Sequence, residues 1–342
     1  MESTSELQKT CLQLALEGER FCGQGDCKRG VQLFETALQV GTSDLDTLSA
    51  IYTELGNAYF VLHQYREALK YYNYDLNLAR MMRDRANEGK AYSNLSIALK
   101  ALNLFEEAFA CCQHQLKIYK ETADLAGEAK AYYNTGNVHY AVAKQSLVNE
   151  IEVQGRTHNS LLQAIHNYKL SIEASKQVKE DSSLLGRCYG NVGNALYLLG
   201  EFKEAILYHK KRLKLACLHG DLEAQKRAHT NLGNCCIFSR RFQTAITHYE
   251  ACLTLSQQIG DKAMEAQAHY NLGCNAYSLI GKLKVSLKYH QEHLVLAKLL
   301  KDKMGEMRAW WSLSDVYSRM EDPDNAQHCY NCYYQLSSSQ VC

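Results

Sequence analysis

The sequence predicts an all-α protein: a right-handed superhelical solenoid of about eight stacked helix pairs with a period of 40 residues. One observation is that the 342 residues include a single proline, Pro323, where an average usage of about 5 per cent would give about 17. Proline breaks helix interiors and punctuates loops, so this chain can run in nearly continuous helix. The other observation is a short motif that recurs in a fixed register with an aspartate.

The recurring motif is Asn-Leu-Gly-Asn or a variant of it. Its first residues stand at positions 54, 94, 134, 191, 231, 271 and 312, in steps of 40, 40, 57, 40, 40 and 41. An aspartate stands ten residues upstream of every copy, and its side chain can accept hydrogen bonds from the free N–H groups of a helix start, which predicts an N-cap. The series is Asp44, Asp84, Asp124, Asp181, Asp221, Asp261 and Asp302. Two markers in one register indicate an internal repeat.

Each repeat divides into two helices, which we call A and B. In the second repeat, apolar residues three or four apart predict helix A over about 48–62 and helix B over about 65–80. Helix B opens with an aromatic residue or leucine, and a small residue follows three positions later, as at Phe202 and Ala205. This alanine and the glycine of the motif let the two helices approach closely. A single pair cannot bury its apolar face alone, so neighbouring pairs are expected to stack.

The chain is therefore predicted to be one array over residues 1–342. The repeats are expected at about 8–43, 44–83, 84–123, 124–180, 181–220, 221–260, 261–301 and 302–338. The 57-residue step places 17 additional residues at about 144–160, as a loop or a helix extension between helices A and B of the fourth repeat. The 41-residue step holds one extra residue, either near Gly281 in the turn or at Cys274. In the second case Asn275 takes the place of the motif asparagine through a π-bulge.

Composition and missing motifs exclude several function classes. The net charge of +1 argues against a general nucleic-acid binder. No apolar run is long enough to predict a membrane helix, and no signal peptide is recognised. The 14 cysteines are expected to be mostly free and buried, in a reducing compartment. Cys329 and Cys332 have no second pair at zinc spacing, and no phosphate loop or nucleophile elbow occurs. No enzyme activity, cofactor or metal is therefore expected.

The motif asparagines are the first candidate site residues. In stacked pairs helix A lines the concave groove, and an amide offers both a donor and an acceptor, so a ladder of asparagines can hold an extended peptide backbone. The alternative is that some of them only bond neighbouring helices. The second asparagine of each motif is the better groove candidate. The candidates are Asn57, Asn94, Asn134, Asn137, Asn191, Asn194, Asn231, Asn234 and Asn271, and the strongest contacts are expected between Asn134 and Asn234.

A mostly basic position stands four residues before each motif, one turn below the first asparagine on the same face. Arginine pairs bidentately with carboxylates, so this stripe predicts an acidic ligand. The alternative is a solvated stripe, or ion pairs to linker carboxylates such as Glu88. The groove candidates are Arg187, Arg227 and Arg308, with Lys226 beside them and Lys90 and Lys130 as weaker members.

This pattern resembles the tetratricopeptide repeat (TPR), whose Leu-Gly…Tyr…Ala…Phe pattern appears at Leu55, Gly56, Tyr59, Ala68 and Tyr72, with tyrosine in the last place. The usual period of that repeat is 34. The 40-residue period, the tripeptide Leu-Gly-Asn, the Gly-Asp-x-x-x-Glu-Ala linker at 260–266 and the long fourth repeat resemble the Pins/LGN family more closely. The blocks at 14–20 and 47–60 do so as well. The resemblance covers about residues 10–338.

The resemblance implies a cytoplasmic adaptor, also found at the cell cortex and spindle poles, in G-protein signalling, cell polarity, spindle orientation and asymmetric cell division. Repeats of that family bind a peptide of Inscuteable or of NuMA/Mud, and acidic side chains of the partner meet arginines of the groove. GoLoco motifs of the family bind Gαi. No such motif is recognised in these residues, so Gαi is an expected partner only if a GoLoco region exists outside this chain. Neither nucleic acid nor direct membrane insertion is expected.

Two alternatives remain open. One is a truncated competitor that binds the adaptor's partner without reaching Gαi. The other is a co-chaperone-type TPR protein, whose carboxylate clamp needs a lysine just before the first motif residue. That place holds Thr53, Ser93, Tyr133, Gly190, Thr230, Tyr270 and Trp311.

Overall fold

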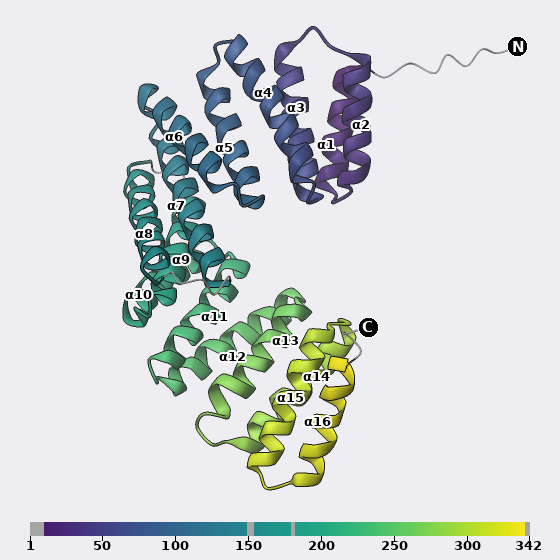
Figure 1. Cartoon of the computed structure of the whole chain (residues 1–342), viewed down its shortest axis with the longest axis vertical. Helices are drawn as coiled ribbons and strands as arrows, with labels where there is room; N and C mark the ends of the chain where they lie inside the picture. The colour runs from purple at the N-terminus through teal and green to yellow at the C-terminus, as the bar shows by residue number, and fades with distance from the viewer. Residues whose placement is uncertain (1–9, 149–153, 179–181, 339–342) are drawn as a thin grey trace, which may run out of the picture. The chain divides into compact units, whose positions relative to one another are not determined.

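The computed structural model describes residues 10–148, 154–178 and 182–338, and these are almost entirely helical, without a β-strand (Figure 1). The chain divides into two compact units, residues 1–185 and 186–342. The helices are α1 (Cys11–Gly23), α2 (Cys27–Val40), α3 (Leu45–Val61), α4 (Tyr65–Met81), α5 (Arg85–Ala101), α6 (Phe105–Glu121), α7 (Leu125–Val148), α8 (Gln154–Gln177), α9 (Ser182–Leu198), α10 (Phe202–Leu218), α11 (Leu222–Phe238), α12 (Phe242–Ile259), α13 (Lys262–Tyr270), η1 (Asn271–Tyr277, a π-helix), α14 (Leu283–Leu299), α15 (Lys303–Arg319) and α16 (Pro323–Ser338).

The all-α prediction is confirmed, and the period follows from helix length. Helices α3, α4 and α5 have 17 residues each, and connections of three residues, 62–64 and 82–84, join them. Helix A of the second repeat begins at Leu45, directly after the cap Asp44 and three residues earlier than the apolar pattern indicated. No described helix is both long and apolar enough to span a membrane.

The aspartate series caps the A helices as predicted. In each described member, a carboxylate oxygen accepts a hydrogen bond from the backbone N–H three residues further on, at 2.9–3.2 Å. Such a cap contributes about 1 kcal/mol to helix stability. Asp181 lies outside the described residues. The capping members are Asp44, Asp84, Asp124, Asp221, Asp261 and Asp302.

The motif glycine lies against a ring from helix B of its own repeat. A Cβ atom at these glycines would come within 2.3–2.8 Å of a ring atom, closer than real Cβ contacts. The pairs are Gly56 with Tyr72, Gly136 with Tyr168, Gly193 with His209, Gly233 with Tyr249, and Gly273 with His290. The third repeat has Ser96 in the glycine place, and Cys112 stands in the place of the ring. The motif glycine therefore makes room for one large buried side chain.

The two irregular steps are accommodated inside helices. In the fourth repeat, α7 and α8 have 24 residues each, so the described part of the 144–160 insertion extends both helices; residues 149–153 of it lie outside the described residues. In the seventh repeat, the π-helix η1 includes Cys274 and Asn275. This confirms the second of the two alternatives, a π-bulge in helix A. Pro323 opens α16, where its missing N–H costs nothing.

Where the structure describes a whole connection between helices, the chain turns there through one residue with positive φ. Ala123 has φ 52° after α6, and Gly220 has φ 65° at the corresponding place after α10. The left-handed conformation costs an L-residue about 1 kcal/mol, whereas glycine adopts it freely.

Ala123→Gly is therefore expected to raise the free energy of unfolding by about 1 kcal/mol, and the reciprocal Gly220→Ala to lower it by about as much. Urea denaturation followed by circular dichroism measures both. If the two substitutions shift the denaturation midpoint in the same direction, backbone strain at these connections does not determine their effect on stability.

Candidate functional site

The A helices of neighbouring repeats lie side by side within each unit, and we call the surface that they form the A-helix face. Helix α1 contacts α3, and α5 contacts α7. Asn134 on α7 donates from Nδ2 to Oγ of Ser93 on α5 at 2.9 Å. In the second unit, Asn231 on α11 donates from Nδ2 to Oδ1 of Asn194 on α9 at 2.9 Å. Polar residues in or directly before the motifs of successive repeats therefore bond one another between adjacent A helices.

The second asparagine of three motifs is held by a tyrosine of helix B. The hydroxyls of Tyr72, Tyr168 and Tyr249 donate to Oδ1 of Asn57, Asn137 and Asn234, at 2.9, 2.9 and 2.8 Å. Because Oδ1 is turned to helix B, Nδ2 is turned away from it. The donor end of Asn57 meets Oε1 of Glu54 at 3.3 Å. The motif glycine thus has a second effect, because the ring that it admits orients the neighbouring asparagine.

Two first asparagines depart from the groove prediction. Asn134 is 7% exposed and also donates to Oε1 of Gln115, at 3.3 Å. Asn271 is 5% exposed, and its Oδ1 accepts from Gln267 at 3.1 Å and from Asn275 at 3.3 Å. Both were expected to line the groove, and both instead make polar contacts inside the helical layer. Asn94, Asn191 and Asn231 are half-buried and remain candidates for ligand contact.

The three predicted arginines are exposed. Arg227 keeps 61% of its side chain exposed, with Nε 3.3 Å from the carbonyl oxygen of Glu223 and a guanidinium nitrogen 4.0 Å from its carboxylate. Arg308 lies 3.8 Å from the carboxylate of Asp302 and 5.5 Å from the ring centre of Tyr270. Exposed ion pairs of this kind contribute at most about 1 kcal/mol. Arg227 and Arg308 can therefore exchange these contacts for a ligand carboxylate. Lys90 and Lys130 are also exposed.

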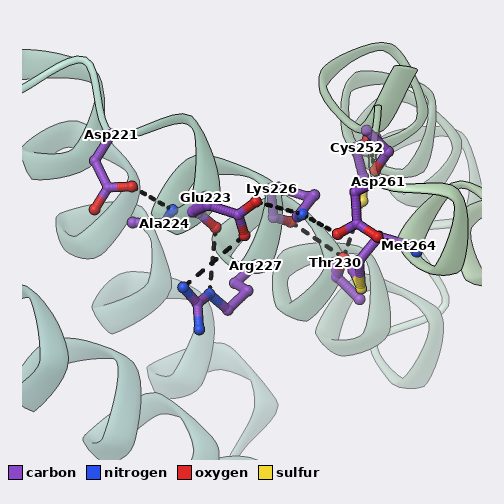
Figure 2. Close-up of polar contacts among 10 residues, drawn as sticks. Asp221, Glu223, Ala224, Lys226, Arg227, Thr230, Cys252, Asp261 and Met264 are labelled. Carbon is purple, nitrogen blue, oxygen red and sulfur yellow. Dashed lines mark hydrogen bonds and ion pairs between the residues drawn. The ribbon is translucent and has the colours of Figure 1, made fainter. Parts of the chain in front are cut away.

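Lys226 was predicted to belong to the basic stripe that faces a ligand, and that prediction is wrong. Its side chain is 1% exposed, and Nζ donates to Oε1 of Glu223 at 2.9 Å and to the carboxylate of Asp261, the cap of α13 (Figure 2). Burial by itself lowers the pKa of Lys226, but the bonds to Asp261 and Glu223 hold it above its usual value. The bond from Lys226 likewise lowers the pKa of Asp261. Lys226 therefore joins the sixth repeat to the seventh and does not face a ligand.

The alternative of ion pairs to carboxylates near the linkers holds for three of the basic residues, although Glu88 is not their partner. The pairs are Lys226 with Asp261, Arg227 with Glu223, and Arg308 with Asp302. Glu88 pairs with Arg80 at 3.3 Å and with Arg85 at 2.6 Å. These arginines lie outside the predicted stripe. Lys90, the stripe residue nearest to Glu88 in sequence, donates to Oδ1 of Asn87 at 3.1 Å.

The structure also shows two hollows between successive A helices that sequence reasoning missed. One lies between α1 and α3, beside Leu16, Ile51 and Glu54. The other lies between α13 and α15, beside Tyr270 and Trp311. The sequence held one signal for the second hollow. In the seventh and eighth repeats an aromatic residue, Tyr270 or Trp311, stands directly before the motif.

Comparisons with known proteins agree with these repeats. Models described as tetratricopeptide repeat match residues 226–298, 89–124 and 308–339. The chain is 55% identical over 205 residues to "G-protein-signaling modulator 1" of Mus musculus, covering 59% of this chain and 30% of that protein. It is 46% identical over 208 residues to the Homo sapiens protein of that name, covering 59% and 31%. The chain thus matches less than a third of the length of these relatives.

Solved structures share the fold at low sequence identity. A signal transduction ATPase with a tetratricopeptide repeat sensor from Pyrococcus horikoshii aligns with a TM-score of 0.67 at 14% identity, over 98% of this chain and 55% of that one. The apo form of the quorum sensor NprR from B. thuringiensis aligns with a TM-score of 0.64 at 14% identity, over 95% and 86%. These similarities concern the arrangement of helix pairs.

Proposed function

We propose that this Pins/LGN-like tetratricopeptide-repeat chain is a protein-binding adaptor in G-protein signalling, and that its A-helix face binds an extended acidic peptide. The partner that we propose is Inscuteable-like or NuMA/Mud-like. This proposal places the chain in spindle orientation, cell polarity and asymmetric cell division, in the cytoplasm and at the cell cortex and spindle poles. The relatives named as G-protein-signaling modulators and the resemblance of the repeats to the Pins/LGN family support it.

One observation in the second unit carries the proposal. On α9, Arg187, Asn191 and Asn194 are spaced four and three residues apart, so they share one helix face. On α11, Arg227, Asn231 and Asn234 repeat that spacing. The hydrogen bond from Asn231 to Asn194 joins these two rows at 2.9 Å. Two arginines and four amides are therefore presented by adjacent helices.

The chemistry of these rows suits an extended acidic chain. Guanidinium groups bind carboxylates through two parallel hydrogen bonds, and they hold their charge at any physiological pH. Amide groups can bond both the N–H and the C=O of a peptide that has no partner strand. Acidic side chains would supply the affinity for the arginines, and the amides would fix the backbone of the ligand.

The test is fluorescence anisotropy with a fluorescein-labelled Inscuteable-like acidic peptide. The charge reversal Arg187→Glu with Arg227→Glu is expected to weaken binding by about 100-fold or more, since like charges placed opposite each other cost several kcal/mol. The matched control is Lys203→Glu with Lys214→Glu, the same charge change at exposed positions of the B helix α10.

The control is expected to change affinity by about threefold or less, because it alters only the long-range field. Equal weakening by both pairs of substitutions would mean that net charge, and not the A-helix face, governs binding. Unchanged binding after the arginine reversal would show that the ligand lies elsewhere.

A further inference from the structure

The hollow between α13 and α15 is lined mainly by large apolar side chains. Its volume is about 310 Å³, and the residues around it include Tyr270, Met304, Met307, Arg308, Trp311 and Tyr333. Trp311 is 55% exposed and Met304 56% exposed. The rings of Trp311 and Tyr333 are 5.3 Å apart, edge to face, which fixes one wall. Large apolar side chains left open beside a hollow are typical of a binding surface.

Polar recognition is weak at this end of the array. In the seventh repeat the π-helix brings Asn275 to the place of the second asparagine, and the motif of the eighth repeat has Asp315 there. Asn271 bonds Gln267 and Asn275 within its own helix, through the π-helix. The amides of the seventh motif thus bond within their own helix, and large apolar side chains are the main chemistry that this hollow offers.

The charge of Arg308 at the edge of the hollow favours an apolar ligand group that has a carboxylate beside it. Arg308 lies above the ring of Tyr270 at 5.5 Å, at the edge of the hollow. A cation in the ligand would be repelled there, whereas a carboxylate would be attracted. The hollow between α1 and α3 has the opposite charge, since Glu19, Asp44, Asp46 and Glu54 lie around it. Burial, and secondarily the charge of Glu19, raises the pKa of Glu54, so this second hollow resists further negative charge.

We infer that the hollow between α13 and α15 binds a bulky apolar side chain of the acidic partner peptide, while Arg308 pairs with a carboxylate close to that side chain in sequence. This inference rests on the proposed function and deepens it, because it states what the peptide must contain besides acidic residues. A purely acidic peptide would satisfy the arginines of α9 and α11 but would leave this hollow open.

The experiment is a selection with the full chain, immobilised, from a phage-displayed library of 16-residue peptides rich in Asp and Glu with random remaining positions. Peptides selected by the unsubstituted chain are expected to contain Phe, Leu, Trp or Met within four residues of a carboxylate. Their affinities are then measured as synthetic peptides. Trp311→Ala is expected to weaken binding by about tenfold or more, the range of well-packed interface residues, and Arg308→Gln by about threefold or more.

The matched control is Leu16→Ala, which removes an exposed apolar residue from the hollow between α1 and α3. It is expected to leave the affinity of the selected peptides unchanged. Thermal melts of all variants check the fold. If acidic peptides are selected with no apolar preference, or if Trp311→Ala binds as well as the control, this inference is wrong and the proposed function stands. If no acidic peptide is selected, both are wrong.

Discussion

Gly233→Ala is expected to lower the free energy of unfolding by about 1–3 kcal/mol, the usual cost of overpacking a filled core. The result runs against helix propensity, because alanine is favoured over glycine inside a helix by about 1 kcal/mol. The reason is the ring of Tyr249, which a Cβ at position 233 would approach to 2.4 Å. Tyr249 is fully buried, and its hydroxyl is bonded to Asn234, so the ring cannot move away without losing that bond.

The matched control is Gly186→Ala, in α9 of the same unit. A Cβ at position 186 would have its nearest neighbour, Cδ2 of Leu215, at 3.4 Å, which is an ordinary contact. This substitution is expected to raise stability by up to about 1 kcal/mol through propensity alone. Urea denaturation of the two variants measures the difference. Equal shifts of the two midpoints would contradict the proposed role of the tyrosine ring.

A double-mutant cycle also tests the contact between position 233 and the side chain at position 249. The third repeat combines Ser96 with Cys112 in the places of Gly233 and Tyr249. The variant Gly233→Ser with Tyr249→Cys is therefore expected to lose less stability than the sum of the two single changes.

Lys226→Met is expected to lower the free energy of unfolding by about 2 kcal/mol or more. Removing one partner of a buried ion pair leaves the other partner's charge uncompensated, which costs about 3–5 kcal/mol where both partners are buried. The cost is smaller here because Asp261 keeps 28% of its side chain exposed. The control is Lys70→Met, whose side chain is 51% exposed and lies 3.8 Å from the carboxylate of Glu67, itself 50% exposed. Its expected effect is about 1 kcal/mol or less.

The loss of unfolding free energy caused by Lys226→Met is expected to depend on pH. Lys226 holds the pKa of Asp261 below its usual value, so the stability from this pair is present above the unfolded-state pKa of about 3.9 and is lost as pH falls through the lower folded value. The raised pKa of Lys226 keeps the contribution in place up to alkaline pH. Denaturation at pH 7 and near pH 3 is expected to show a smaller difference at the lower pH. A difference independent of pH would mean that packing of the lysine stem, and not its charge, stabilises the pair.

The fold was predictable because its signals are local. Asp221 caps α11 through an atom three residues away, and the same spacing recurs at each described repeat, so one interpretation applies throughout. The motif glycine is similar, since its partner ring stands 16 residues further on at Gly233 and Tyr249. Helix ends were less predictable from apolar spacing alone, which indicated a start at about 48 for the helix that begins at Leu45, directly after the predicted cap Asp44.

The site was less predictable, because adjacent positions on a helix point about 100° apart. Lys226 and Arg227 are neighbours in sequence, yet one is 1% exposed and the other 61%. Composition and spacing assign both residues to one basic stripe. Only the position of Asp261 in the next repeat shows that Lys226 is buried in an ion pair whereas Arg227 is exposed. The hollow beside Trp311 depends in the same way on Tyr270, which stands in the preceding repeat, so a single repeat carries no sign of it.

The π-helix of the seventh repeat bears on how such a chain can change over time. Its extra residue is taken up within seven residues, and Asp302 caps the next A helix with the same geometry as the other aspartates. The caps on either side of the insertion, Asp261 and Asp302, therefore keep the same geometry. Repeats can then diverge one at a time, and a partner's preference can be revised at one end of the chain while binding at the other end is inherited unchanged.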